Sequence, residues 1–282
     1  MAGALATTTP ALATASPECV AAVDMAIVTR LPVVDWAENL AYDRQGDLWV
    51  SRPLRSEVDR YDSAGNLTAA VAVQNPMAVR EGPDGWMYVV SNPVPGALVG
   101  DSEVVRFDPA ANDPRPQRFA AGLLAPDGAV FDAEGNLYVT DLYTGVIRIR
   151  PDGSLDDAWN ARANLFSGNG LVVIGRYLYI NITASFGGQI VRMSIDDPAD
   201  RSVLTDLLPG GVPAFPDDLA VGPDGKLYVA TGGIGRLMRV DPNTGGVCQL
   251  AATEPVTAIA VGPTGDLMLS TQLGNILRGR VF

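Results

Sequence analysis

The sequence contains no histidine. This absence excludes a Ser-His-Asp triad, a histidine-ligated zinc site and a histidine general base. Any chemistry must therefore depend on carboxylates, amides, hydroxyls or a metal bound by oxygen atoms. Charged residues are also scarce, at 18% against 47% apolar residues, so the chain has ample material for a folded core.

Basic residues are outnumbered, with 20 Lys and Arg against 32 Asp and Glu and a net charge of −12. This acidity disfavours nucleic acid and anionic membranes as partners, and it is compatible with cation binding. No apolar run approaches the length of a membrane span. We therefore expect a small-molecule partner, no nucleic acid and no membrane.

The N-terminal segment is rich in Ala and Thr and carries no charge from Met1 to Pro17. Ala13-Thr14-Ala15 is typical of a signal-peptidase site, although a positive n-region and a strong apolar h-region are missing. We interpret residues 1–20 as a leader or signal-peptide remnant and residues 21–282 as one domain of a secreted or periplasmic protein. The only two cysteines, Cys19 and Cys248, either form one disulfide in such a protein or stay as two unpaired thiols.

One pattern recurs six times along the chain: a short strand, a tight turn containing Gly, and a second strand. The turns read D-x-x-G or G-P-x-G, as expected of hairpin loops that need a positive φ. The flanking residues are β-branched, aromatic or Leu, which strands prefer. The repeat predicts an all-β fold, a single six-bladed β-propeller with four-stranded antiparallel blades. The six segments begin at Leu40, Met77, Ala129, Leu171, Leu219 and Ile259.

A third strand follows each hairpin and carries an arginine in register, which we interpret as a strand-end ion pair or hydrogen bond between neighbouring blades. Fourth strands follow in turn, including a weak one near Trp159. The segment Met25 to Pro32 is expected to supply the outer strand of the last blade and so close the ring. This closure brings Cys19 near the outer edge of the fifth blade, where Cys248 lies, and favours a disulfide. The arginines are Arg60, Arg106, Arg148, Arg192, Arg239 and Arg278.

Polar side chains stand two residues before the apolar start of each innermost strand, where they should point into one mouth of the central channel. Carboxylates that converge in a poorly solvated channel either take raised pKa values or are neutralised by a cation. No Lys or Arg is aligned with them, and Ca²⁺ suits an irregular shell of carboxylate and amide oxygens. The alternative is a water-filled polar channel with protonated or hydrogen-bonded carboxyl groups. The six residues are Glu38, Asn75, Asp127, Asn169, Asp217 and Thr257.

At these residues the sequence resembles the senescence marker protein/gluconolactonase family of six-bladed propellers, over Asp35 to Phe282. The resemblance implies that Glu38 in A-E-N-L, Asn169 in G-N-G-L and Asp217 in F-P-D-D-L hold the family's metal, here Ca²⁺ or another divalent cation. The third blade departs from the family, because Pro126 stands where the family often has Asn. This departure weakens the expectation of a sugar lactone as substrate.

The resemblance implies a calcium-dependent hydrolase of a lactone or related ester, in which the metal polarises the carbonyl and activates water. Asp217 would also act as general base, and Asp127 would orient substrate or take part in proton transfer. Asn75, Asp127 and Thr257 would line the substrate pocket. Two alternatives stay open: a secreted binding propeller for protein or carbohydrate, without catalysis, and an enzyme similar to strictosidine synthase, which shares the fold.

Overall fold

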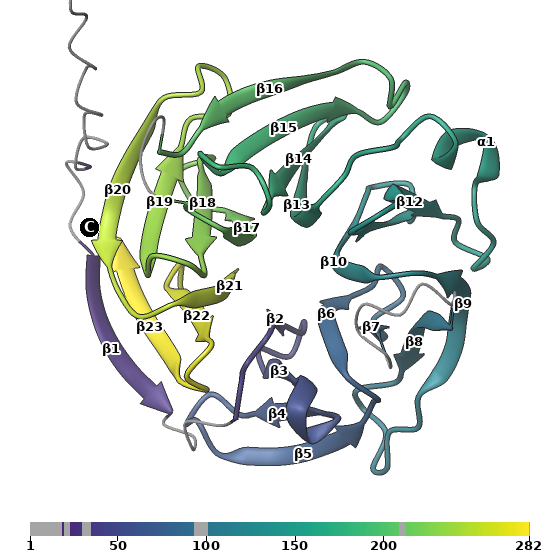
Figure 1. The fold of residues 1–282 in the computed structure, drawn as a ribbon. Coiled ribbons are helices and arrows are strands. Elements are labelled where there is room, and N and C mark those ends of the chain that lie inside the picture. Colours follow the sequence, from purple (N-terminus) through teal and green to yellow (C-terminus); the bar gives the residue numbers. More distant parts are fainter. Residues whose placement is uncertain (1–18, 20–22, 30–34, 93–100, 209–212, 282) are drawn as a thin grey trace, which may run out of the picture.

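The computed structural model describes residues 19, 23–29, 35–92, 101–208 and 213–281 of the chain. These residues form six antiparallel sheets that stand around a central axis (Figure 1). The innermost strand of each sheet contacts the innermost strand of the next, and the last contacts the first. The predicted six-bladed β-propeller is therefore confirmed. The expected leader, residues 1–20, lies outside the described residues except for Cys19.

The blades are numbered in chain order, and their strands run from the axis outward (Figure 1). Blade 1 consists of β2 (Leu40–Tyr42), β3 (Leu48–Arg52), β4 (Glu57–Tyr61) and β5 (Leu67–Ala72), with the 3-10 helix η1 (Pro53–Arg55) between β3 and β4. Blade 2 consists of β6 (Pro76–Glu81), β7 (Met87–Ser91), β8 (Ser102–Phe107) and β9 (Gln117–Leu123). Blade 3 consists of β10 (Pro126–Phe131), β11 (Leu137–Asp141) and β12 (Gly145–Ile149).

The remaining blades each have four strands. Blade 4 consists of β13 (Gly168–Ile174), β14 (Tyr177–Ile182), β15 (Gln189–Ser194) and β16 (Arg201–Asp206). Blade 5 consists of β17 (Pro216–Val221), β18 (Leu227–Thr231), β19 (Arg236–Val240) and β20 (Val247–Ala252). Blade 6 consists of β21 (Val256–Val261), β22 (Leu267–Thr271), β23 (Ile276–Val281) and, as its outer strand, β1 (Val23–Thr29).

The ring is closed by the N-terminal strand, as predicted. β1 pairs antiparallel with β23, so both ends of the described chain belong to blade 6 (Figure 1). A disulfide joins Cys19 to Cys248 on β20, the outer strand of blade 5, and the Cys19 N–H donates to the Gln249 carbonyl at 2.9 Å. The favoured pairing of the two cysteines is thus confirmed, and it links the segment before β1 to the neighbouring blade.

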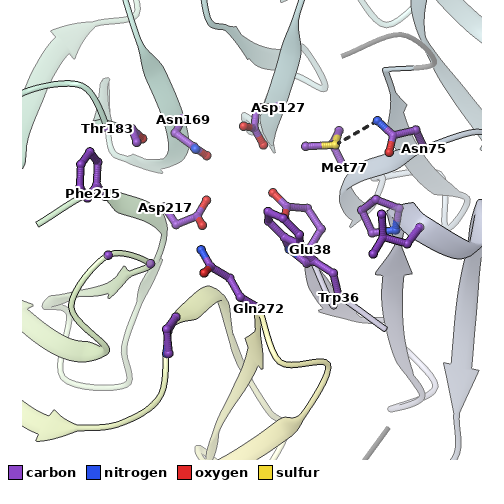
Figure 2. A pocket seen from close by; sticks show the side chains of 15 residues that line it. Trp36, Glu38, Asn75, Met77, Asp127, Asn169, Thr183, Phe215, Asp217 and Gln272 are labelled. Carbon is purple, nitrogen blue, oxygen red and sulfur yellow. Dashed lines mark hydrogen bonds between the residues drawn. The ribbon is translucent and has the colours of Figure 1, made fainter. Parts of the chain in front are cut away.

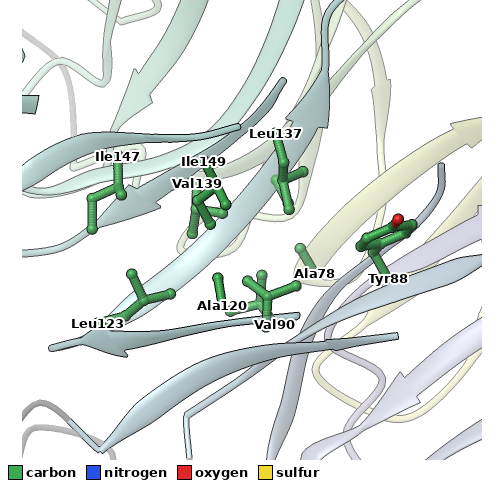
Figure 3. Packing of buried hydrophobic residues seen from close by; sticks show 11 residues of the cluster. Ala78, Tyr88, Val90, Ala120, Leu123, Leu137, Val139, Ile147 and Ile149 are labelled. Atoms are coloured by element: carbon green, nitrogen blue, oxygen red, sulfur yellow. The ribbon is translucent and has the colours of Figure 1, made fainter. Parts of the chain in front are cut away.

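The core consists of apolar layers between adjacent blades. The second strands β3, β7, β11, β18 and β22 are buried along their whole length, because a neighbouring blade covers each of their faces. Figure 3 shows one such layer, where Val90 and Leu123 of blade 2 meet Val139 and Ile149 of blade 3. This double burial explains why the second strands read as apolar runs in the sequence.

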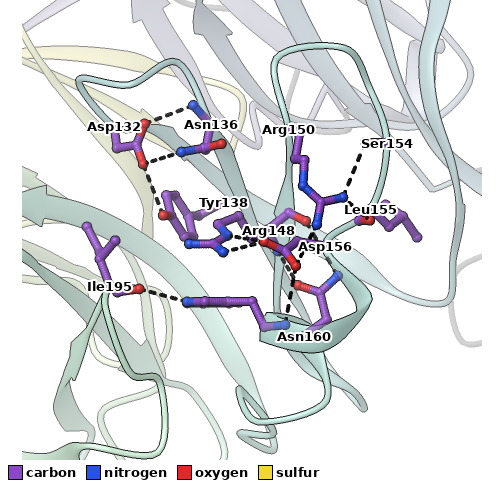
Figure 4. Close-up of polar contacts among 11 residues, drawn as sticks. Asp132, Asn136, Tyr138, Arg148, Arg150, Ser154, Leu155, Asp156, Asn160 and Ile195 are labelled. Carbon is purple, nitrogen blue, oxygen red and sulfur yellow. Dashed lines mark hydrogen bonds and ion pairs between the residues drawn. The ribbon is translucent and has the colours of Figure 1, made fainter.

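Blade 3 departs from the prediction. No fourth strand is seen among its described residues, and helix α1 (Asp157–Asn160) lies where the weak strand near Trp159 was expected. Asp156 caps the helix by accepting from the Trp159 N–H, and it also pairs with Arg148 of β12 at 2.9 Å (Figure 4). The Trp159 indole is buried and donates to the Ile195 carbonyl at 2.7 Å. The buried aromatic ring therefore fills the space at this edge.

No described helix is long and apolar enough to span a membrane.

The arginines of the third strands lie in register, but most pair within their own blade. Arg106 contacts Asp84 at 3.3 Å and Arg278 contacts Asp266 at 2.7 Å, and each partner belongs to the first hairpin turn of the same blade. The expectation of ion pairs between neighbouring blades is wrong for Arg106 and Arg278, which instead hold the first hairpin turn of their own blade against its third strand. Arg60 does make the expected hydrogen bond between blades, because it donates to the Pro109 carbonyl of blade 2 at 3.0 Å.

Candidate functional site

The site is built by irregular starts of the innermost strands. In β10 the register shifts between Pro126 and Ala129, and β13 and β17 shift in the same way around Asn169 and Asp217. A β-bulge of this kind interrupts the alternation of side chains and re-aims one of them. The bulged residues of blades 3, 4 and 5 therefore point toward the axis, where Figure 2 shows Asp127, Asn169 and Asp217 facing one another.

The strand registers also correct the predicted ring. Val79 pairs with Val89 as Ala129 pairs with Val139, so the blade 2 equivalent of Asp127 is Met77. Asn75 stands two residues too early, because the apolar Met77 occupies the bulge position and reads as the start of the strand. The equivalent residues are Glu38, Met77, Asp127, Asn169, Asp217 and Thr257.

Asn75 still reaches the site from the edge of blade 2. Its backbone has φ 41°, a left-handed conformation, and its amide donates to the Asn92 carbonyl at 2.6 Å. Thr257 does not reach it. Its side chain is fully buried, and its hydroxyl donates to the Ala37 carbonyl at 2.6 Å, next to Glu38. Asn75 therefore lies in the pocket wall as predicted, whereas Thr257 does not line the pocket.

A cavity of about 730 Å³ opens above these residues at one mouth of the channel. Its floor holds carboxyl and amide groups, while apolar side chains form much of its wall (Figure 2). None of its described lining residues is Lys or Arg. The sequence did not predict the wall, because Trp36, Leu54 and Phe215 belong to connecting segments outside the repeat, and Met77 reads as an ordinary strand residue. The floor residues are Glu38, Asp127, Asn169, Asp217 and Gln272; the larger apolar residues are Trp36, Leu54, Met77 and Phe215.

The carboxyl groups of the floor strongly affect one another's pKa. Burial, and then the charge of Asp127, raises the pKa of Glu38 from 4.5 to about 8. Burial, and then the charge of Asp218, raises the pKa of Asp127 from 3.8 to about 7. Burial, and then the charge of Glu38, raises the pKa of Asp217 well above 3.8. Three carboxyl groups thus share a poorly solvated space that favours either protons or a cation.

No Lys or Arg is aligned with the floor residues, as the sequence indicated, but one arginine lies close to them. Arg80 of β6 extends across the channel and pairs with Asp218 of β17 at 3.0 Å. Asn39 completes the contact, because its amide donates to the same Asp218 oxygen at 3.0 Å and its carbonyl oxygen accepts from Arg80. Asn39 and Asp218 directly follow Glu38 and Asp217 in the sequence. The network therefore joins three inner strands beneath the floor and fixes the backbone of two of its carboxylates.

Arg80 is the charged member of a row formed by the equivalent inner-strand residues of the six blades. The equivalent residues of the other blades are small and apolar, and with Arg80 they line a shallower cavity of about 250 Å³ further along the inner strands. Arg80 thus pairs with Asp218 beneath the acidic floor and also lines the cavity further along the channel. The residues of the row are Ala41, Arg80, Val130, Val172, Ala220 and Ala260.

Two further contacts position the floor. The Thr140 hydroxyl donates to the Asn169 carbonyl and accepts from the Gly128 N–H at 2.9 Å, so it joins the bulges of blades 3 and 4. Gly170 allows blades 4 and 5 to approach, because a Cβ there would stand 2.4 Å from the Asp218 Cα. The backbones that carry Asp127, Asn169 and Asp217 are therefore held in close contact.

The donor set fits a hard cation in part. Glu38, Asn169 and Asp217 supply carboxylate and amide oxygens, which Ca²⁺ prefers, and the crowding of the carboxyl groups would be relieved by a positive charge. Among the described residues, no three Asp, Glu, His or Cys side chains form a metal cluster by themselves. A cation here would thus depend on the amide of Asn169 as well as on two carboxylates, and the predicted metal and catalytic roles stay predictions.

No protein-family model matches the chain, and no curated protein matches it. Among solved structures, a gluconolactonase from Xanthomonas campestris superimposes with a TM-score of 0.72 and 15% identity, over 97% of this chain and 99% of that one. Regucalcin from Agrobacterium tumefaciens, a calcium-binding protein, gives 0.69 and 16% over 95% of each chain. A PQQ-bound aldose sugar dehydrogenase from Streptomyces coelicolor gives 0.67 and 16% over 95% and 100%. At these identities the likeness establishes the fold, which several activities share.

Proposed function

We propose that this protein is a calcium-dependent hydrolase of a lactone or a related ester. The observation that carries the proposal is the meeting of Glu38, Asp127 and Asp217 with Asn169 on the floor of a cavity that no described Lys or Arg lines. The fold likeness to a gluconolactonase and to calcium-binding regucalcin agrees with it.

The floor residues have separate roles in the proposed reaction. Glu38, Asn169 and Asp217 would hold the cation, which when bound supplies Lewis-acid polarisation of the carbonyl and acidifies an adjacent water. Asp217 accepts the proton that the attacking water loses, and Asp127, on the bulge of blade 3, orients the ring and returns a proton to the leaving alkoxide oxygen. Ring opening then gives the hydroxy acid, with no other reactant than water.

The charge of the site argues against the redox activity found on the same fold. PQQ carries several carboxylate groups, which together with Glu38, Asp127 and Asp217 exceed the charge of one divalent cation, and no described Lys or Arg lines the cavity to pair with the rest. A neutral lactone has no such cost. A binding propeller without catalysis would not need carboxyl groups with raised pKa values, whereas an enzyme that transfers protons would, so we favour the enzyme.

The disulfide between Cys19 and Cys248 supports export as part of the proposal. Such bonds persist in oxidising compartments and are rare where thiols are kept reduced. We infer a secreted or periplasmic location, in agreement with the uncharged, Ala-rich N-terminal segment of the sequence.

Hydrolysis of a lactone panel tests the proposal. Protein treated with EDTA should be inactive, added Ca²⁺ should restore hydrolysis, and Asp217→Asn should lower the rate about 100-fold or more. Asp113→Asn is the matched control, since Asp113 is an exposed turn residue outside the cavity and should retain the full rate. Calcium binding without hydrolysis of any lactone or ester would contradict the enzyme and favour a binding propeller.

A further inference from the structure

The face of the propeller that holds the cavity is unusually apolar. In an antiparallel blade, the loops between second and third strands and those leading into each innermost strand lie on one face. Of the ten large apolar side chains that are exposed among the described residues, seven belong to these loops. Trp36, Leu54 and Phe215 line the cavity itself and are 37%, 67% and 47% exposed. The acidic floor is therefore surrounded by apolar surface.

A second cavity of about 430 Å³ adjoins the first over blades 3 and 4. The two cavities share Asp127, Asn169, Thr183 and Phe215, so the floor opens sideways into the second one. Its further lining is mostly apolar, with small side chains that leave room for a ligand. These apolar residues are Ala125, Pro126, Leu142 and Ala184.

Phe215 lines both cavities, and its backbone conformation there is strained. Its backbone has φ 46°, a left-handed conformation that bulky residues rarely adopt. The Gly232 N–H donates to the Phe215 carbonyl at 3.0 Å, and Gly233 leaves room for the ring, since a Cβ there would stand 2.4 Å from the Phe215 Cδ2. An exposed aromatic ring in a strained conformation is a feature of ligand-contacting sites.

We propose that the substrate is a neutral lactone or ester that carries an apolar alkyl or aromatic substituent. This rests on the proposed function. The reacting carbonyl lies over Asp127 and Asp217, and the substituent passes Phe215 into the second cavity. A polyhydroxylated ring would place hydroxyls against the apolar side chains of Phe215 and Leu142, and a hydroxyl buried there without a hydrogen bond is costly. An anionic substrate would face the carboxylates with no described Lys or Arg beside it.

Binding of non-hydrolysable lactams measures this preference apart from catalysis. Isothermal titration calorimetry on the calcium-loaded protein would use γ-butyrolactam with no substituent or with alkyl chains of four and eight carbons, and a polyhydroxylated lactam. The affinity should rise about fourfold per methylene until the second cavity is filled. The polyhydroxylated lactam should bind more weakly than the four-carbon compound.

Three variants test where the alkyl chain of the lactam binds. Phe215→Ala should flatten the dependence on chain length, and Ala184→Phe should shorten the longest chain whose addition still raises affinity. Phe186→Ala is the matched control, because Phe186 is 65% exposed on the same face and lines neither cavity, so it should retain the dependence. Circular dichroism would confirm that each variant is folded.

The outcomes separate this proposal from the one that it rests on. If the polyhydroxylated lactam binds best, or if Phe215→Ala and Ala184→Phe leave the chain-length dependence unchanged, the apolar substrate is refuted while a hydrolase remains. If no lactam binds and no lactone is hydrolysed in calcium, the hydrolase itself is wrong.

Discussion

Replacing Arg80 by methionine would remove the positive charge beneath the acidic floor. The guanidinium pairs with Asp218 at 3.0 Å and donates to the Asn39 side chain, so the variant breaks the contact that joins β2, β6 and β17. Methionine keeps most of the length and apolar volume of the side chain. The variant therefore tests the charge rather than the packing.

The expected cost follows from the burial of the pair. The Asp218 side chain is 3% exposed, so without Arg80 it becomes a buried carboxylate with no cationic partner among its described neighbours. Removing one partner of a buried ion pair typically costs 3–5 kcal/mol. Because the Arg80 side chain is 18% exposed, we expect about 3 kcal/mol, and a Tm lowered by about 5 °C for a chain of 282 residues.

A double-mutant cycle in urea would measure the effect through tryptophan fluorescence. Arg80→Met should cost about 3 kcal/mol in the wild type but at least 1 kcal/mol less in an Asp218→Asn background, where no charge is left unpaired. The urea midpoint should move with little change in the m-value. An equal cost in both backgrounds would rule out a role for the charge, because Arg80 would then act through packing alone.

Three further predictions concern the floor and the closure. Because burial and then Asp127 raise the pKa of Glu38 from 4.5 to about 8, the metal-free folded protein holds a proton that the unfolded chain releases. The contribution of Glu38 to stability should be complete below about pH 4.5 and fall by about 1.4 kcal/mol per pH unit toward pH 8, seen as a falling Tm in EDTA. Asp127, whose pKa is raised to about 7, and Asp217 add to the same fall. A Tm that rises over this range would contradict the raised pKa values. Gly170→Ala places a Cβ 2.4 Å from a backbone atom and should cost about 2 kcal/mol with loss of calcium-dependent stabilisation, measured by melting with and without Ca²⁺. Replacing Cys19 and Cys248 by serine opens a cross-link over 229 residues and should cost up to about 5 kcal/mol by urea unfolding; an unchanged midpoint would mean that the bond adds nothing.

The fold could be predicted because each blade repeats the same local signals. A Gly-containing turn between two apolar strands needs no long-range information, and six copies imply a ring. The closure by β1 and the disulfide to Cys248 also followed, because the sixth blade lacks an outer strand in its own part of the chain. The exception is α1, where a buried Trp159 and a capping Asp156 outweigh the weak strand pattern.

The floor could be predicted in part. Counting back from the hairpins placed Glu38, Asp127, Asn169 and Asp217 in one cavity, as the structure does. The count failed in blade 2, where Met77 resembles a strand residue although it occupies a bulge. Thr257 holds the right position, but its hydroxyl is used by the backbone of the neighbouring blade.

The Arg80 contact and the apolar wall could not be read from the repeat. Arg80 meets a carboxylate 138 residues away across the channel, and only the small residues at the equivalent positions of other blades mark it as exceptional. Trp36, Leu54 and Phe215 come from connecting segments with no common pattern, so their meeting depends on the closed ring.

The most direct test of the account is a calorimetric titration of Ca²⁺ into protein freed of metal with EDTA. We expect binding of one ion to the wild type and to Asp113→Asn, and a loss of at least about 10-fold in affinity in Asp217→Asn. Absence of binding to the wild type, or equal binding to Asp217→Asn, would contradict a metal site on the floor of the channel.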